Sequence, residues 1–436
     1  MASMTTRRSA KMDRVLVTVG AIVSINIVSI VGTSFLSLNE KVKYKLILVQ
    51  SWLTLQSVMF FSARYLWIRL CLPLYNHPSN INRLLLAFII IVLSLSQGSI
   101  VLGLIFSGVE PHWISLLSYT SLGLLILLTS TTVISDLFTW MFGVVNLRSG
   151  LVNSRIHYAR FQVILILVIS TTLAVLALQN AIKEPMVKKV RIPMKNLPSE
   201  FNGFTIVMLP DVHVGPTVGR TMLEKVVKTT NQLNPDAVSI NGDLVDASVY
   251  QIRQAVKPLL KLRARYGVYF VTGNHDYYTG DIDGWMKELE YLGVTPLRNS
   301  HVLLTHPNKP QVELCLAGVD DTEGGFLRSG DHGTDIGKAL TGVNHGTPTV
   351  LLAHRPKVAK LALDDYHVDL VLTGHTHGGQ LFPIHLFHLV AEPFFAGLYQ
   401  HKSGSYVYVS SGVHFWGMPM RLWSKAEITH VTLTTA

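Results

Sequence analysis

Cysteine is scarce in this sequence. Of 436 residues only two are cysteines, Cys71 and Cys315, and they lie in different halves of the chain. Two such residues cannot build a disulfide framework or a Cys-x-x-Cys zinc ribbon. Residues 200–436 also lack an Asn-x-Ser/Thr sequence, so this half shows no sign of secretory glycosylation.

Acidic residues are scarce in the first half of the chain. Residues 1–199 contain 18 basic and 5 acidic residues, a net charge of +13, whereas residues 200–436 contain 19 and 22, a net charge of −3. The basic residues of the first half lie between long apolar runs, as they do in loops beside a bilayer. The overall charge of +10 therefore indicates a membrane, and we expect no nucleic-acid partner.

Long apolar runs fill the first half. A helix of about 20 residues crosses a hydrocarbon core. Five runs are long enough, at residues 15–36, 46–63, 84–106, 113–134 and 161–181. They predict an integral, multi-pass membrane domain over residues 1–181, whose first run is a retained signal anchor. A linker rich in proline and charge is expected over residues 182–203.

The charges around these runs do not fix the orientation of the membrane domain. With five crossings, ten basic residues flank the runs on the side of the N-terminus and eight on the opposite side, which is too small a difference for the positive-inside rule. Asp136 follows the fourth run directly. We expect an interfacial position for this residue rather than a place in a transport path.

Five polar clusters follow short apolar runs in the second half. The runs are residues 204–209, 237–240, 268–271, 350–353 and 368–372, and each reads as a buried strand. Groups at the carboxyl ends of strands in a sheet wound with helices converge on one crevice. The clusters contribute Asp, Asn and His side chains. This mixed oxygen and nitrogen set suits manganese, iron, cobalt or zinc.

In order, the clusters are Asp-Val-His at 211–213, Gly-Asp at 242–243, Gly-Asn-His-Asp at 273–276, the lone His354 and Gly-His-Thr-His at 374–377. This series resembles the calcineurin-like metallophosphoesterase superfamily. The sequences GHTHGGQ at 374–380 and YVSSG at 408–412, with MPMR at 418–421, are similar to the membrane-associated branch that includes the bacterial YkuE-type enzymes. The resemblance covers roughly residues 200–436. It implies an α/β sandwich over residues 204–436, in which two mixed sheets are flanked by helices.

The resemblance also implies roles for individual residues. A centre of two divalent ions (manganese, iron or zinc) would be bridged by Asp243. The other ligands would be Asp211, His213 and His377 at the first ion, and Asn274, His354 and His375 at the second. His275 would face the substrate phosphate, and Asp276 would hold its ring. An imidazole suits proton transfer near neutral pH.

The reaction expected from the resemblance is hydrolysis of a phosphomonoester or phosphodiester by metal-bound hydroxide. The substrate is a phosphate ester, and a lipid-linked ester is one of the classes left open. The rival interpretation is a non-catalytic membrane scaffold or sensor with a vestigial esterase domain. Because every expected ligand is present, the sequence favours the enzyme.

Four charged residues outside these clusters are expected to have structural roles or, in one case, to contact phosphate. Asp246 is expected to cap a helix rather than bind metal. Asp320 and Asp321 are expected in a solvated turn. Arg355 is left between a phosphate clamp and a structural ion pair.

Residues 382–399, FPIHLFHLVAEPFFAGLY, are rich in Phe, Leu and Ile and follow the last histidine cluster. We favour a packed connection between strands for this segment. The alternative is an exposed apolar lip that accepts a lipid chain.

Overall fold

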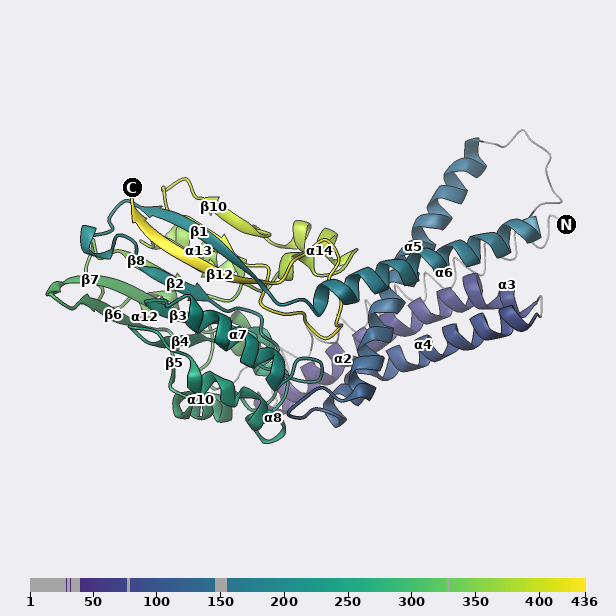
Figure 1. Cartoon of the computed structure of the whole chain (residues 1–436), viewed down its shortest axis with the longest axis horizontal. Coiled ribbons are helices and arrows are strands. Elements are labelled where there is room, and N and C mark those ends of the chain that lie inside the picture. The colour runs from purple at the N-terminus through teal and green to yellow at the C-terminus, as the bar shows by residue number, and fades with distance from the viewer. Residues whose placement is uncertain (1–28, 30–31, 33–39, 77–78, 146–154, 328–329) are drawn as a thin grey trace. The chain divides into compact units, whose positions relative to one another are not determined.

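The computed structural model describes residues 29, 32, 40–76, 79–145, 155–327 and 330–436 (Figure 1). The chain divides into two compact units. The first contains Met1–Gly98 and Leu124–Thr171, and the second contains Ser99–Gly123 and Thr172–Ala436.

Long apolar helices dominate the first unit, although the end of α4, the start of α5 and the end of α6 belong to the second. They are α2 (Glu40–Leu66), continued by a π-helical turn (Trp67–Cys71) and α3 (Leu72–Tyr75), then α4 (Asn80–Ile105), α5 (Trp113–Val145) and α6 (Arg155–Ala181). Four helical stretches are long and apolar enough to cross a membrane: Lys45–Tyr75, Asn80–Ile105, Trp113–Met141 and Arg160–Ala181. They confirm four of the five expected spans. The first, residues 15–36, lies outside the described residues apart from 29 and 32.

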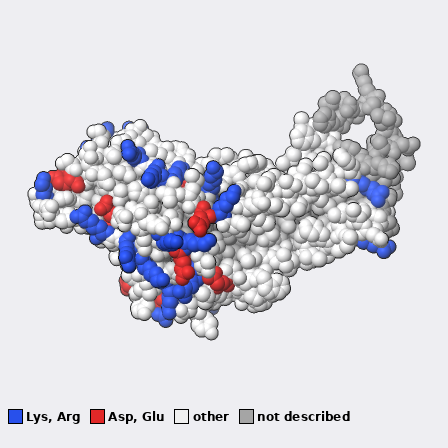
Figure 2. Space-filling model, viewed as in Figure 1, with Lys and Arg blue, Asp and Glu red and all other residues white. Residues whose placement is uncertain are grey.

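The surface of these helices suits lipid. Large apolar side chains such as Phe88, Trp140 and Phe161 are exposed. In Figure 2 the surface over the long helices is nearly all white, whereas charged side chains gather over the sheets. In α5, the hydroxyls of Thr129 and Ser130 donate to carbonyls one turn earlier. These two hydroxyls are therefore satisfied within the helix, as a bilayer requires.

Asp136 lies within α5, because this helix continues beyond the end of the predicted run. Its carboxylate accepts a hydrogen bond of 2.7 Å from the Tyr65 hydroxyl and pairs with the Arg69 guanidinium. An intramembrane carboxylate is tolerated when it is paired in this way. Asp136 therefore has a structural role in an ion pair, and its interfacial position stays a prediction.

Two six-stranded mixed sheets form the second unit. The first has the order β1-β12-β2-β3-β4-β5 and the second β10-β11-β9-β8-β7-β6. The strands of the first sheet are β1 (Met186–Met194), β12 (Glu427–Thr435), β2 (Thr205–Met208), β3 (Ala237–Asn241), β4 (Val268–Val271) and β5 (Val294–Pro296). Those of the second are β10 (Gly397–Gln400), β11 (Tyr406–Val409), β9 (Leu370–Thr373), β8 (Thr349–Leu352), β7 (Lys309–Gly318) and β6 (Ser300–His306).

The five predicted strands are confirmed as β2, β3, β4, β8 and β9. Side chains from both sheets share one buried core, including Met208 of β2, Leu352 of β8 and Leu433 of β12. Helices cover the outer faces: α7 (Arg220–Gln232), α8 (Val249–Val256) and α10 (Ile282–Tyr291) on the side of the first sheet, and α13 (Pro356–Asp365) against the second (Figure 1). The expected α/β sandwich of two mixed sheets is confirmed.

The segment expected to be a linker differs from the prediction. Within residues 182–203, Met186–Met194 forms β1, which pairs in parallel with β12 over its whole length. Only residues 182–185 separate α6 from this strand. β1 is an edge strand, where Lys188, Lys189 and Pro193 are tolerated because one side of the ladder is unpaired. Those residues made the segment look irregular in the sequence.

Candidate metal centre

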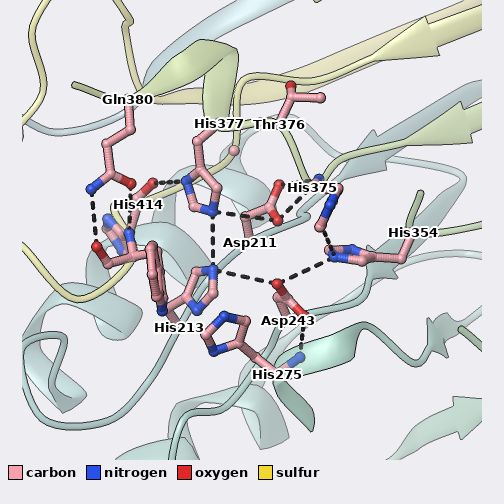
Figure 3. A network of polar contacts seen from close by, with 12 residues as sticks. Asp211, His213, Asp243, His275, His354, His375, Thr376, His377, Gln380 and His414 are labelled. Atoms are coloured by element: carbon pink, nitrogen blue, oxygen red, sulfur yellow. Dashed lines mark hydrogen bonds and ion pairs between the residues drawn. The ribbon is translucent and has the colours of Figure 1, made fainter. Parts of the chain in front are cut away.

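The predicted ligands meet where strands of both sheets end (Figure 3). The first sheet contributes Asp211 and His213 after β2, Asp243 after β3 and Asn274 after β4. The second contributes His354 after β8, and His375 and His377 after β9. The carboxyl ends of the central strands therefore bring all seven residues to one edge of the sandwich, as the sequence predicted.

Asp243 lies between two groups of side chains. Its Oδ2 is 3.7 Å from His213 Nε2 on one side and 3.2 Å from His354 Nε2 on the other. Asp211, His213 and His377 place ligand atoms within 4.8 Å of one another, and so do Asp243, His354 and His375. A carboxylate between two such groups is well placed to bridge two cations.

The backbone of this site is strained. Asp211, His213, Asp243, His375 and His377 all have positive φ, between 49° and 72°. Such angles are uncommon for residues with a side chain and concentrate at functional sites. Gly242, with φ of 80°, precedes Asp243, and a Cβ there would lie 2.6 Å from His354 Nδ1. The tight turns therefore bring loops of both sheets so close together that their side chains could bind the same cation.

Hydrogen bonds orient three of the imidazole rings. His354 Nδ1 lies 2.9 Å from the Asn241 carbonyl oxygen, and His213 Nδ1 lies 3.0 Å from Asp246 Oδ1. His377 Nδ1 lies 3.3 Å from the His414 carbonyl oxygen. When Nδ1–H donates to an oxygen, the lone pair on Nε2 is free for a metal. Each of these rings directs Nε2 into the site.

The chemistry of this set fits divalent cations. His213 Nε2 and His377 Nε2 lie 3.0 Å apart, and a cation between them would accept the lone pairs of both nitrogens. Asn274 Oδ1 is buried and has no hydrogen-bond partner among the described residues. Burial raises the pKa of the Asp211 carboxyl to about 6, and a bound cation would oppose that rise. Buried oxygen and nitrogen atoms without protons are ligands for manganese, iron or zinc.

His275 lies at the rim of this set, but its carboxylate partner is not the predicted one. His275 Nδ1 is 2.8 Å from Asp246 Oδ1. Asp276 instead accepts hydrogen bonds from the backbone N–H groups of Gly273, Asp243 and Leu244. Asp276 therefore connects the loops after β3 and β4. The carboxylate that contacts the His275 ring is that of Asp246.

The sequence suggested that Asp246 caps a helix, and this expectation is wrong. Ser248 is the N-cap of α8, in a capping box with Gln251. The Asp246 carboxylate contacts both His213 Nδ1 and His275 Nδ1. Burial would raise the pKa of this carboxyl, but the two imidazoles hold it well below its usual range. One carboxylate thus orients a candidate ligand and the candidate catalytic ring.

Arg421 fixes the backbone next to the site by hydrogen bonds to carbonyl oxygens. The sequence did not predict this role. The side chain is fully buried. Its guanidinium donates to the carbonyl oxygens of Ser411 and His414, both at 2.6 Å, and to Ser424 Oγ at 3.0 Å. Burial lowers the pKa of this group to about 10. Arg421 is the last residue of the MPMR sequence at 418–421.

Asp320, Asp321 and Arg355 form buried ion pairs. Asp320 and Asp321 are 1% and 2% exposed, so the expected solvated turn is wrong. Asp320 pairs with Arg298, and Asp321 pairs with Arg355. Arg355 also contacts Glu323 at 2.8 Å. Of the two roles left open for Arg355, the structure shows the ion pair.

The segment after the last histidine cluster forms helix α14 (Ile384–Ala391), which contains no buried residue. Phe387 and Val390 are 69% and 90% exposed. The favoured expectation of a packed connection is therefore wrong for this helix. The expectation of a packed connection holds for Phe394, which packs against the core of the second sheet.

Comparison with known proteins agrees with this geometry. The family model for calcineurin-like phosphoesterases matches residues 204–379. A protein of Danio rerio named transmembrane protein with metallophosphoesterase domain is 41% identical over 89% of this chain and 90% of its own length. The Bos taurus protein of the same name is 38% identical over 88% and 89%.

A more distant relative is the uncharacterized metallophosphoesterase YkuE of Bacillus subtilis, 33% identical over 54% of this chain and 81% of its own length. The predicted resemblance to that branch is thus confirmed at the level of sequence. The two vertebrate relatives extend the likeness across the membrane helices. The chain belongs to the calcineurin-like phosphoesterase family and is a metal-dependent phosphoesterase integrated into a membrane by several helices.

Proposed function

We propose that this protein hydrolyses a phosphomonoester or phosphodiester at a centre of two divalent ions. Asp211, His213 and His377 would hold the first ion, and Asn274, His354 and His375 would hold the second. Asp243 would contribute to both sites. The observation that carries this assignment is the position of the Asp243 carboxylate, with candidate ligands converging on it from both sides.

The bound ions supply Lewis acidity, which activates water and neutralises charge on the phosphoryl oxygens. The chain supplies the rest. His275, at the rim and only partly buried, contacts the substrate and donates a proton to the leaving oxygen. Asp246 orients the His275 ring through Nδ1, so that Nε2 faces the substrate. Asp276 holds the loops after β3 and β4 together by accepting hydrogen bonds from their backbone N–H groups.

A non-catalytic scaffold is the weaker candidate. A vestigial site would be free to lose ligands, whereas all seven proposed ligands are present and six are less than 10% exposed: Asp211, His213, Asp243, Asn274, His354 and His377. The basic charge lies with the membrane helices, and the catalytic half has a net charge of −3. This charge distribution gives no footprint for nucleic acid.

The test is hydrolysis of bis-p-nitrophenyl phosphate and p-nitrophenyl phosphate by the purified full chain, with added manganese or zinc. Asp243→Asn should reduce turnover to background and lower the metal content, because an amide bridges two cations poorly. Asp283→Asn is the matched control, since this carboxylate is 85% exposed. Turnover that persists in Asp243→Asn would contradict the proposal.

A further inference from the structure

Helix α14 presents an apolar surface to its surroundings. Leu386, Phe387, Leu389 and Val390 are 56%, 69%, 55% and 90% exposed, and Trp423 nearby is 72% exposed. The Trp423 ring contacts the rings of Phe382 and His385 at the base of the helix. We call these five exposed residues the α14–Trp423 surface. Contiguous exposed apolar groups mark a site of interaction.

This surface borders the metal centre. The short helical turn His377–Gly379 leads into α14. The His388 ring, on α14, lies 6.0 Å from the ring of His375, a proposed ligand. His385 packs so closely on Gly379 that a Cβ there would lie 2.6 Å from its ring. A molecule lying on α14 would therefore reach the proposed second ion.

The same region is fixed to the ends of membrane-spanning helices. Arg421 N–H donates to the Ala177 carbonyl of α6 at 2.9 Å, and Asn180 of α6 donates back to the Arg421 carbonyl. Met420 packs on Gly123 of α5, where a Cβ would lie 2.5 Å from its sulfur. Trp423 thus follows, by two residues, a segment held against the last turns of α6.

A second attachment is made by the α4–α5 connection. Glu110 accepts hydrogen bonds from the backbone N–H and the hydroxyl of Thr221 at the start of α7. Gln251 of α8 donates to the Leu104 carbonyl. α6 is also followed by β1 after only residues 182–185, so the sandwich is attached to the ends of these helices at several points.

We infer that the α14–Trp423 surface inserts among the acyl chains of the bilayer, and that the substrate of the metal centre is a membrane phospholipid. This inference rests on the proposed phosphoesterase function and adds the class of its substrate. The lipid contacts α14 with its chains, while its phosphate reaches the metals past His388. Trp423 suits the boundary, since indole rings favour the interface between lipid and water.

Insertion is tested on the full chain in phosphatidylcholine nanodiscs. Phe387→Cys carries an environment-sensitive fluorophore, and the native Cys71 and Cys315 are buried, so labelling is selective. We expect quenching by lipids brominated in their acyl chains and protection from aqueous iodide. Leu303→Cys, on β6 of the second sheet and 39% exposed, is the control and should show the opposite pattern. Equal iodide access at both positions would overturn the insertion.

The substrate class is tested with phosphatidic acid and phosphatidylglycerol in phosphatidylcholine vesicles, beside soluble bis-p-nitrophenyl phosphate. Phe387→Ser with Val390→Ser should lower lipid turnover at least about tenfold, because the two lost apolar contacts together exceed the 1.4 kcal/mol that a factor of ten represents. Turnover of the soluble ester should not change. Leu260→Ser with Leu303→Ser, two exposed apolar positions away from α14, is the control pair.

The possible failures are distinct. Equal losses on lipid and soluble esters would overturn the role of the α14–Trp423 surface. A wild-type protein that hydrolyses the soluble ester but neither lipid would overturn the phospholipid substrate and leave the phosphoesterase intact. A metal-loaded protein that hydrolyses none of the three would overturn the proposed function itself.

Discussion

At the scale of single residues, Asp246 shows how much of this site depends on groups that bind no metal. Its carboxylate lies 3.0 Å from His213 Nδ1 and 2.8 Å from His275 Nδ1. The first contact directs a ligand toward its ion, and the second aligns a ring with the substrate. The orientation of a ligand and the orientation of the candidate catalytic ring therefore depend on the same partly buried carboxylate.

Asp246→Asn tests this coupling. The amide keeps the size of the side chain but removes the charge that stabilises both rings, so metal affinity and turnover should each fall by about 10–100-fold. Metal content by mass spectrometry and kcat with saturating metal measure the two effects separately. Asp364→Asn, a carboxylate in a surface pair with Lys360, should change neither. Unchanged kcat in metal-saturated Asp246→Asn would show that His275 does not need this partner.

At the scale of elements, the loops after β2, β3 and β9 hold the site through unusual backbone angles. Five proposed ligands have positive φ, and the neighbouring glycines leave no room for side chains. At Gly242 a Cβ would lie 2.6 Å from His354 Nδ1 and 2.7 Å from the Gly273 backbone. The loops therefore specify ligand positions by close packing of backbone as well as by side-chain type.

Gly242→Ala and Gly203→Ala form a matched pair. Both positions have positive φ, 80° and 89°, so backbone strain alone should reduce the free energy of unfolding of each variant by about 1–2 kcal/mol. Gly242→Ala should lose more, because its Cβ would also clash with the Gly273 backbone. Only Gly242→Ala should also displace His354 and lose bound metal, since nothing lies within 4 Å of a Cβ at Gly203. Denaturant unfolding and metal analysis of both variants provide the measurement. Equal metal content in the two would refute the role given to the loop after β3.

The elements also show what the sequence could and could not predict. Strands β2, β3, β4, β8 and β9 were predictable because each is a short apolar run closed by a turn and buried on both faces. β1 was not, because Lys188, Lys189, Arg191 and Pro193 hide an edge strand whose partner β12 lies more than two hundred residues away. α14 was expected to be packed because apolar composition alone does not distinguish a core from a lipid-facing surface.

Within the site, the ligand types and their order were predictable from the motifs. The partner of His275 was not, since Asp276 is its neighbour in sequence but directs its carboxylate to backbone N–H groups. Asp246 reaches the ring only through the fold. Arg421 was similarly hidden, because a buried arginine whose partners are mostly carbonyl oxygens has no sequence pattern of its own.

At the scale of the whole molecule, metal should contribute to stability as well as to catalysis. The proposed centre joins loops of both sheets, and its carboxylates are buried. A metal ion that binds only the folded state, at a free concentration of 100 times its Kd, adds about 2.7 kcal/mol to the free energy of unfolding. For a domain of this size, chelation should therefore lower the Tm by roughly 5–10 °C.

Differential scanning fluorimetry of the detergent-solubilised protein, with and without chelator, measures this shift. Asp243→Asn provides the control, since a protein that no longer holds the metals should respond little to the chelator. A wild-type Tm that does not respond to chelation, despite bound metal beforehand, would show that the two sheets do not depend on the ions to stay together.

The position of β12 has a consequence for biosynthesis. This strand, Glu427–Thr435, lies between β1 and β2, which are the first strands of the sandwich to leave the ribosome. While the rest of the domain is made, β1 stays next to the membrane without its only partner. The first sheet closes only when the last strand arrives. A ribosome that stalls shortly before β12 would leave a membrane-anchored chain with two open strand edges, a form that quality-control proteases and chaperones can recognise.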